Sequence, residues 1–267
     1  MALASLDFYS ETLFCEAHMR VLIPERRDGL GYTDLSNDEG KLPVIVLLPG
    51  LGDGCSAWTR YTALERYVRK YGIAVVMPEP MRSLYADMKY GEKVFTYMAQ
   101  EVLRKCCEFF PQISARREDH YAVGCSMGGY GALKLAPGAG ENFGFAAGLS
   151  AAADMVKLCR ENVIGKDCSF PAFGDCSDLE GSDNDLFALA EKQASSGGKL
   201  PEIYLWCGTD DVCYEYNHAL RDALRKLGYR VTYSEREADH QWNQWDREIQ
   251  NVLKAIIEAR GAEYIFW

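Results

Sequence analysis

Short, unbroken runs of apolar residues recur along the chain and predict buried strands. They are Val44–Leu48, Ile73–Met77, Tyr121–Val123 and Ile203–Trp206. Runs of this kind, without polar alternation, are typical of parallel strands that are covered on both faces. Residues 10–24 partly alternate polar and apolar side chains instead, which predicts an antiparallel hairpin at an edge of the sheet.

Helical periodicity fills the intervals between these predicted strands. Apolar residues at three- and four-residue spacing mark Thr59–Tyr71, Glu92–Phe110, Met127–Ala136 and Tyr214–Leu227. Alternating strands and helices imply right-handed βαβ crossovers, and hence an α/β fold with a doubly wound, mostly parallel sheet and N-terminal antiparallel strands. We expect one domain over residues 1–267, with its ligand at the carboxyl ends of the strands.

One segment, at about 154–199, interrupts this rhythm. It is rich in Gly, Ser, Asp and Cys, and we interpret it as a small lid-like insertion or an irregular loop. A long loop in a compact domain is often functional, but an ordinary surface loop fits the composition equally well.

The overall composition limits the kinds of partner. A net charge of -10 disfavours nucleic acid and anionic membrane surfaces, so a neutral or cationic small molecule fits better. No apolar run approaches a membrane span of ~18 residues, and no signal-peptide pattern opens the chain, so we expect a cytoplasmic protein. The ten cysteines form no Cys-x-x-Cys pair, and we expect reduced thiols, no metal and no cofactor. A homo-oligomer is compatible with the sequence.

The candidate nucleophile is Ser126, in the pattern Gly124-Cys125-Ser126-Met127-Gly128. This G-x-S-x-G motif lies between a predicted strand and a predicted helix, which is the setting of a nucleophile elbow. A glycine-rich turn with Ser126 as a helix cap is the structural alternative. Cys125 is a rival nucleophile, but it lies on the strand side of the turn and is predicted to be a packed thiol.

A serine hydroxyl needs a base, and four histidines are available. His18, His120 and His218 lie in the predicted hairpin, strand and helix. His240 follows the strand-like residues 229–233 and precedes a C-terminal helix, so it is the histidine placed on a loop downstream of Ser126.

The acid that orients the histidine is expected between Ser126 and His240 in the chain. Asp210 and Asp211 both follow the predicted strand Ile203–Trp206, and the pattern alone does not choose between them, because either could cap the next helix. Asp239, adjacent to His240, is a third candidate.

An oxyanion hole is expected from two backbone amides. The helix that begins at Met127 leaves its first N–H groups free, and the glycine-rich residues 49–54 follow the first central strand. We assign the N–H groups of Leu51 and Met127 as the donors. The loop lacks the Gly-Lys-Ser/Thr ending of a phosphate-binding loop.

These motifs together resemble the esterase D family of α/β-hydrolases, and most of all its short tributyrin esterase-like carboxylesterases. The residues that carry the resemblance are Leu47–Leu51 with Trp58, Val76–Pro78, Tyr85–Asp87, Tyr90–Gly91, Gly124–Ala132, Trp206–Asp211, Tyr214–Glu215, Val231–Tyr233 and His240–Trp245. The resemblance spans nearly the whole chain, and it implies a triad of Ser126, Asp211 and His240. One departure is Pro49, where the family usually has histidine. This change leaves the backbone N–H of Leu51 available as a donor.

The resemblance implies a serine carboxylesterase for short-chain acyl esters, from acetyl to butyryl, with acetyl or feruloyl esters of plant saccharides as further substrates. S-formylglutathione hydrolase activity is the alternative within the family. Acyl transfer to an alcohol is an alternative of another class, because it uses the same triad but excludes water from the acyl-enzyme. A non-catalytic binding protein has no need of all three triad residues.

Overall fold

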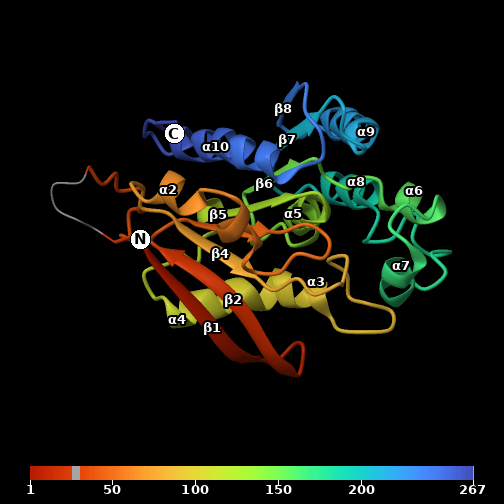
Figure 1. Cartoon of the computed structure of the whole chain (residues 1–267), viewed down its shortest axis with the longest axis horizontal. Coiled ribbons are helices and arrows are strands. Elements are labelled where there is room, and N and C mark those ends of the chain that lie inside the picture. The colour runs from red at the N-terminus through yellow and green to blue at the C-terminus, as the bar shows by residue number, and fades with distance from the viewer. Residues whose placement is uncertain (26–30, 267) are drawn as a thin grey trace.

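A mixed sheet of eight strands runs through the computed structural model, which describes residues 1–25 and 31–266 (Figure 1). The strands are β1 (Ala2–Ser10), β2 (Cys15–Ile23), β3 (Val44–Leu48), β4 (Ala74–Pro78), β5 (His120–Cys125), β6 (Phe145–Leu149), β7 (Glu202–Gly208) and β8 (Val231–Arg236). Their order is β1-β2-β4-β3-β5-β6-β7-β8. The pairs β1–β2 and β2–β4 are antiparallel, and every other neighbouring pair is parallel. The predicted fold class is confirmed.

Helices cover both faces of this sheet. They are α1 (Ala57–Tyr61), α2 (Leu64–Val68), α3 (Val94–Thr96), α4 (Val102–Phe109), α5 (Met127–Gly138), α6 (Met155–Arg160), α7 (Lys166–Phe173), α8 (Leu186–Ser195), α9 (Tyr214–Lys226) and α10 (Trp242–Ala259), with a π-helical turn at Tyr97–Glu101 and a 3-10 turn at Arg117–Asp119. In β3, Val46 packs with the residues of α4 and α5, while Ile45 packs with those of α2 and α10. Both faces of the central strands are therefore buried, as continuous apolar runs require.

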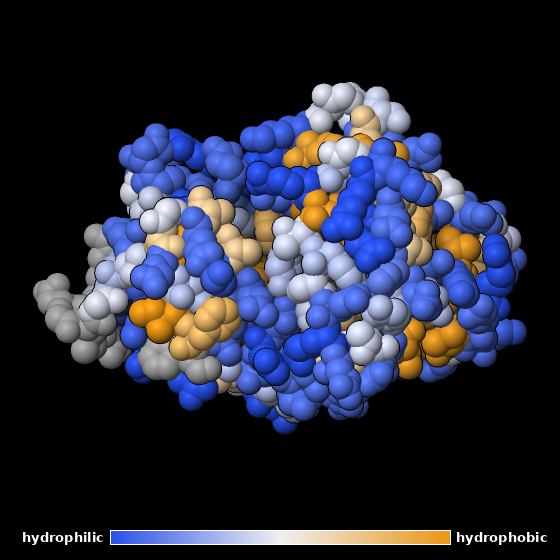
Figure 2. All heavy atoms as spheres, turned by 90° about the horizontal axis from the view of Figure 1, so that it is seen from above, coloured by the Kyte–Doolittle hydropathy of each residue, from blue (hydrophilic) through white to orange (hydrophobic). Residues whose placement is uncertain are grey.

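The helix α10 lies across one face and beside α2 (Figure 1). Its buried side chains recur at helical spacing, among them Ile249, Val252, Leu253 and Ile256. The face of the molecule above α10 is mostly hydrophilic, with separate small apolar patches (Figure 2). Amphipathic packing therefore accounts for the position of this helix.

Two predicted elements differ from the structure in their extent. The N-terminal hairpin begins at Ala2 rather than near Ser10, because the whole first strand pairs with β2. The helix predicted over Thr59–Tyr71 is two short helices. It breaks at Thr62, whose hydroxyl bonds to the carbonyl oxygen of Trp58, and at Ala63, whose N–H donates to Asp246 at 2.8 Å.

Strand β6 was not predicted from the sequence. Its residues, Phe145-Ala146-Ala147-Gly148-Leu149, contain no β-branched side chain, although all but Phe145 are buried. A Cβ atom on Gly148 would lie 2.7 Å from the side chain of Leu133 in α5, so a larger residue there would force that side chain to move. Because α5 packs closely on β6, this strand has small residues in place of the usual β-branched ones.

Residues 154–199 are more regular than an irregular loop, since they contain α6, α7 and α8. The last of these packs against α5 and α9, as a crossover helix between β6 and β7 does. Tyr130 and Lys134 of α5 hold the preceding loop, with hydrogen bonds to the backbone carbonyl of Asn184 (2.7 Å) and to its side chain (2.6 Å). A lid role for the segment stays a prediction.

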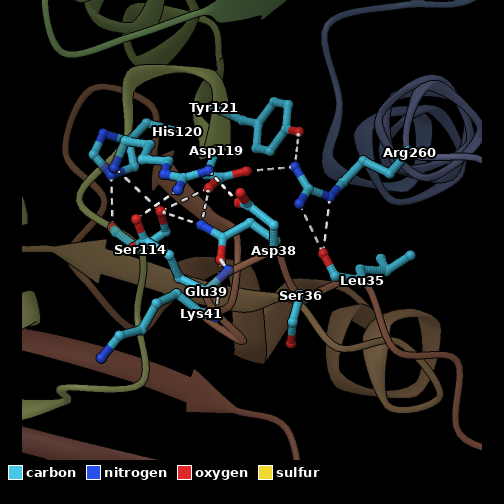
Figure 3. Close-up of polar contacts among 12 residues, drawn as sticks. Leu35, Ser36, Asp38, Glu39, Lys41, Ser114, Asp119, His120, Tyr121 and Arg260 are labelled. Atoms are coloured by element: carbon cyan, nitrogen blue, oxygen red, sulfur yellow. Dashed lines mark hydrogen bonds and ion pairs between the residues drawn. The ribbon is translucent and has the colours of Figure 1, made fainter.

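A buried polar network lies at the amino end of the central strand β5 (Figure 3). Asp119, just before β5, accepts hydrogen bonds from Ser114 at 2.6 Å and from Arg260 at 2.6 Å. Arg260, at the end of α10, also donates to the carbonyl oxygen of Leu35. This network ties three distant segments together at the amino end of β5, far along the strand from Ser126.

Candidate active site

The turn between β5 and α5 holds Ser126 in a strained conformation. Its φ of 53° and ψ of -120° lie in a region that a residue with a Cβ atom rarely occupies. The N–H of Ser126 donates to the carbonyl oxygen of Leu149 at 2.8 Å, and its own carbonyl oxygen accepts from Ala152 at 3.1 Å. Bonds to β6 and to the segment that follows it therefore hold the strained turn, as a nucleophile elbow requires.

Both glycines of the motif permit close backbone contacts. A Cβ atom on Gly124 would lie 2.2 Å from the carbonyl oxygen of Gly128, and one on Gly128 would lie 2.2 Å from that of Leu48. Neither distance is sterically possible. The glycines thus let the helix begin directly against the carboxyl end of β3.

Ser126, His240 and Asp211 form a chain of hydrogen bonds. The Nε2 atom of His240 lies 2.9 Å from the Oγ of Ser126, and its Nδ1 lies 2.9 and 3.0 Å from the two carboxyl oxygens of Asp211. The residues follow β5, β8 and β7 respectively, so all three come from the carboxyl end of the sheet. The structure brings together the three residues that the family resemblance implies.

Asp211 is held as a carboxylate. Burial by itself raises its pKa, but hydrogen bonds from His240, from the Ser150 hydroxyl and from the N–H of Cys213 outweigh burial and lower the pKa below its ordinary value. A carboxylate only accepts hydrogen bonds, so the Nδ1 of His240 carries the proton and Nε2 is left to accept one from Ser126. This is the protonation state that a general base needs.

The other two candidate acids lie elsewhere. Asp210 is exposed, and its side chain makes no hydrogen bond within residues 1–25 and 31–266. The side chain of Asp239 accepts a hydrogen bond from Gln244 at 3.3 Å. The aspartate that bonds to His240 is Asp211, and it is buried.

The remaining histidines each have a partner away from Ser126. His18 pairs with Asp7, His218 pairs with Glu235, and the ring of His120 lies 2.8 Å from the carbonyl oxygen of Ser114. Their positions in the hairpin, in α9 and at the start of β5 agree with the sequence analysis.

The loop after β3 approaches Ser126 closely. Gly50 to Asp53 form a turn, with the N–H of Asp53 donating to the carbonyl oxygen of Gly50 at 3.2 Å and with Gly52 at a φ of 86°. A Cβ atom on Gly50 would lie 3.6 Å from the Cβ of Ser126. Tyr85 fixes the loop through a 2.8 Å hydrogen bond to the carbonyl oxygen of Pro49.

Among the described residues, two backbone amides at this place have no hydrogen-bond acceptor. The N–H of Met127 is in the first position of α5 and has no intrahelical acceptor. The N–H of Leu51 likewise donates no hydrogen bond to another residue in the described part of the chain. Two such groups beside a nucleophile can stabilise an oxyanion.

Cys125 is fully buried in β5. Burial raises the pKa of its thiol well above the ordinary value, so it stays protonated at neutral pH and is a poor nucleophile.

A metal is a poor fit to the nearest group of potential ligands. The ligand atoms of Asp211, Cys213 and His240 lie within 4.8 Å of one another. Burial and the neighbouring carboxylate raise the pKa of the Cys213 thiol to about 12, whereas a metal binds the thiolate. The Nδ1 of His240 is already used by Asp211.

Sequence reasoning missed two residues beside the acid and the base. The hydroxyl of Ser150 accepts a hydrogen bond from the Nε1 of Trp245 at 3.1 Å, and the Trp245 ring meets the His240 ring edge to face at 4.9 Å. Ser150 gave no signal because it follows β6, the strand that was not predicted. Trp245 was noted for the family resemblance and not for a contact.

Known proteins resemble this chain over nearly its full length. The model of the esterase family, described as "Putative esterase", matches residues 10–256. The acetyl esterase of Caldicellulosiruptor saccharolyticus is 30% identical over 262 residues, which cover 95% of this chain and 97% of that protein. This chain therefore belongs to the esterase family.

Two solved structures from Staphylococcus aureus have the same fold. The fluorophosphonate-binding serine hydrolase F, with substrate bound, is 28% identical, with a TM-score of 0.84 and coverage of 96% of this chain and 98% of that one. An S-formylglutathione hydrolase is also 28% identical, with a TM-score of 0.82 and the same coverage. Together with the family, these similarities identify the protein as a carboxylic ester hydrolase of the α/β-hydrolase fold. In the part of the chain that the structure describes, no helix is long and apolar enough to span a membrane.

Proposed function

We propose that this protein is a serine carboxylesterase for short-chain acyl esters, with Ser126 as nucleophile, His240 as base and Asp211 as the acid that orients it. The observation that carries the proposal is the unbroken chain of hydrogen bonds from Ser126 through His240 to the buried Asp211.

The reaction begins when Nε2 of His240 takes the proton of Ser126 as Oγ attacks the ester carbonyl carbon. The N–H groups of Leu51 and Met127 stabilise the resulting oxyanion, and Asp211 stabilises the imidazolium. The carbon–oxygen bond to the alcohol then breaks, and the alcohol leaves with the proton from Nε2. Water attacks the acyl-Ser126 ester, gives a proton to Nε2, and releases the acid as that proton returns to Ser126.

The similar proteins support a small acyl group. The acetyl esterase and the S-formylglutathione hydrolase are both named for acyl groups of one or two carbons. The loop at Gly50 packs directly against the nucleophile, since a Cβ atom on Gly50 would be in van der Waals contact with the Cβ of Ser126 at 3.6 Å. We therefore expect acetyl to butyryl esters to react fastest.

An aromatic cluster beside His240, in which Trp58 and Trp245 are buried and Tyr61 is exposed, supports apolar or aryl groups elsewhere in the substrate. Trp242 contacts Trp245, Trp58 and Tyr61 with ring centroids 5.1 to 5.2 Å apart. Tyr61 is 47% exposed. Stacking on such rings favours flat groups, of which a feruloyl or nitrophenyl group is an example.

The test is a panel of p-nitrophenyl esters from acetyl to dodecanoyl, measured beside acetylated xylo-oligosaccharide, methyl ferulate and S-formylglutathione. We expect kcat/KM for acetyl and butyryl esters to exceed that for octanoyl by about tenfold or more, the effect of a few unaccommodated methylene groups. A rate that rises steadily to dodecanoyl contradicts a short-chain specificity. S-formylglutathione as the best substrate of the panel establishes the alternative within the family. The similarity to the staphylococcal S-formylglutathione hydrolase favours that alternative.

Acyl transfer is separated from hydrolysis by product analysis. With p-nitrophenyl acetate and an added alcohol such as glycerol, we expect acetate as the main product. A new ester in excess of acetate contradicts hydrolysis as the principal reaction.

A further inference from the structure

Ser150, at the carboxyl end of β6, has an unusual backbone. Its φ is 49°, in the left-handed region that glycine adopts readily and other residues rarely do. It is fully buried, and its N–H donates to the carbonyl oxygen of Trp206 at 2.7 Å. Glycine would be accommodated more easily in this position, so the presence of serine indicates that its hydroxyl has a role.

The direction of the hydrogen bonds at this hydroxyl follows from the chemistry of its partners. The Nε1 of Trp245 can only donate, so the Oγ of Ser150 is the acceptor in their 3.1 Å contact. The hydroxyl proton is then free for Asp211, whose carboxylate can only accept and which has a hydrogen bond to Ser150.

Other groups around Asp211 do not replace this bond. The thiol of Cys207 also lies beside the Ser150 hydroxyl, but a neutral sulfur is a much weaker acceptor than a carboxylate. Cys213 donates its backbone N–H to Asp211 at 2.8 Å. The titratable groups that face Asp211 are therefore His240 and the thiols of Cys207 and Cys213.

Trp245 joins the acid to the base by a second route. Its ring, 5% exposed, lies edge to face against the His240 ring, with an interplanar angle of 89°. Its Nε1 reaches Ser150, and Ser150 reaches Asp211. One rigid side chain thus contacts the imidazole directly and the carboxyl through a single hydroxyl.

We propose that Ser150 and Trp245 are positioning residues that keep the Asp211 carboxylate aligned with Nδ1 of His240. The inference rests on the proposed triad and extends it to β6 and α10. Without the Ser150 hydroxyl, Asp211 loses one of the groups that hold its carboxylate besides His240, and the carboxylate can turn out of alignment.

The test is a double-mutant cycle between Ser150→Gly and Asp211→Asn, measured with p-nitrophenyl acetate. Glycine suits the positive φ of Ser150, so the backbone is retained while the hydroxyl is lost. We expect Ser150→Gly alone to lower kcat by about tenfold, the worth of one hydrogen bond to a charged group, and to leave KM within about twofold. In the Asp211→Asn background it is expected to cost less than about twofold, because Ser150 acts only through Asp211.

A matched control is Phe14→Gly. Phe14 has a similar φ of 55° and is 80% exposed in the β1–β2 turn, so this substitution introduces glycine at another left-handed position without touching the site. We expect its kcat to equal that of the wild type. An equal loss from Ser150→Gly with and without Asp211 overturns the proposal, because a merely structural effect persists when the acid is absent.

Trp245→Phe is a second, independent variant. It keeps a ring against His240 but removes the Nε1–H donor, and we expect a several-fold loss of kcat that does not add to that of Ser150→Gly. Fully additive losses in the double variant Ser150→Gly/Trp245→Phe contradict the proposal, and so does wild-type kcat in both single variants. If one of the two variants is unstable, the other still tests the proposal. Failure of the triad itself is distinguishable, since Asp211→Asn alone then leaves turnover high.

Discussion

The Nε2 atom of His240 lies 2.9 Å from the Oγ of Ser126, although 114 positions separate the two residues in the chain. Their contact depends on the parallel sheet, because the turn after β5 and the loop after β8 both leave its carboxyl end. The loop after β7 brings Asp211 to the same edge. The chemistry of the site is thus a consequence of strand order, and each part of it can be tested separately.

Replacing the two adjacent aspartates is expected to give very different results. Asp211→Asn should lower turnover by about 10⁴, because an amide cannot stabilise the imidazolium and selects the wrong tautomer of the histidine. Asp210→Asn should have little effect, since Asp210 is exposed and does not contact His240. Steady-state kinetics of both variants at one pH measure the difference, and a larger loss at Asp210 transfers the role of the acid to that residue.

The oxyanion donor at Leu51 can be removed without a change of loop shape. Leu51 is the second residue of the turn that begins at Gly50, and the following Gly52 has a positive φ, as in a type II turn, where proline is favoured at this position. Leu51→Pro should therefore keep the turn but lose the N–H, and should lower kcat by about 10² to 10³.

The melting temperature of Leu51→Pro and its KM for p-nitrophenyl acetate serve as the controls, and both should stay close to the wild-type values. Leu51→Ala, which retains the N–H, should keep most of the activity. Full turnover by the folded proline variant means that the donor is elsewhere.

Lys134 is expected to make stability depend on pH. It lies buried in α5, where Nζ donates to the carbonyl oxygen of Tyr85 at 2.9 Å and to Asn184, and burial lowers its pKa from 10.5 to about 7. Between these pH values the unfolded chain binds a proton that the folded protein does not. The free energy of unfolding should therefore rise with pH through this window, by up to about 1.4 kcal/mol per pH unit from this group.

Lys134→Met isolates that contribution, because the cysteines and tyrosines that titrate over the same range are common to both proteins. Urea unfolding of the wild type and the variant at pH 7, 8.5 and 10 gives the difference in their unfolding free energies. We expect the unfolding free energy of the wild type to increase relative to that of Lys134→Met as the pH rises. A difference that is constant across the three pH values excludes a neutral Lys134 in the folded protein.

The sequence allowed the elbow and the base to be predicted because their signals are local. Ser126 lies between a short apolar strand and a helix, and His240 is the histidine on a loop between a strand and a helix. The choice between Asp210 and Asp211 could not come from the pattern. It depends on which side chain the turn after β7 buries, and burial is a property of the fold.

Strand β6 and Ser150 show a different limit. The residues of β6 are mostly alanine and glycine because α5 packs closely against them, so neither β propensity nor alternation marks the strand. The contacts that Ser150 makes come from β7 and α10, which are brought together only by the sheet order. Likewise, the break between α1 and α2 depends on Asp246 in α10, which is 183 residues away from Ala63.

Covalent labelling of the nucleophile tests the central claim most directly. Wild-type protein and Ser126→Ala are treated with a fluorophosphonate probe, digested and analysed by mass spectrometry, and p-nitrophenyl acetate turnover is measured on the same samples. We predict stoichiometric modification of Ser126 in the wild type, and in the variant no labelling and a loss of turnover on the order of 10⁶. Labelling of another residue, or more than a tenth of the activity in a folded Ser126→Ala protein, would contradict the assignment of Ser126 as the nucleophile of this esterase.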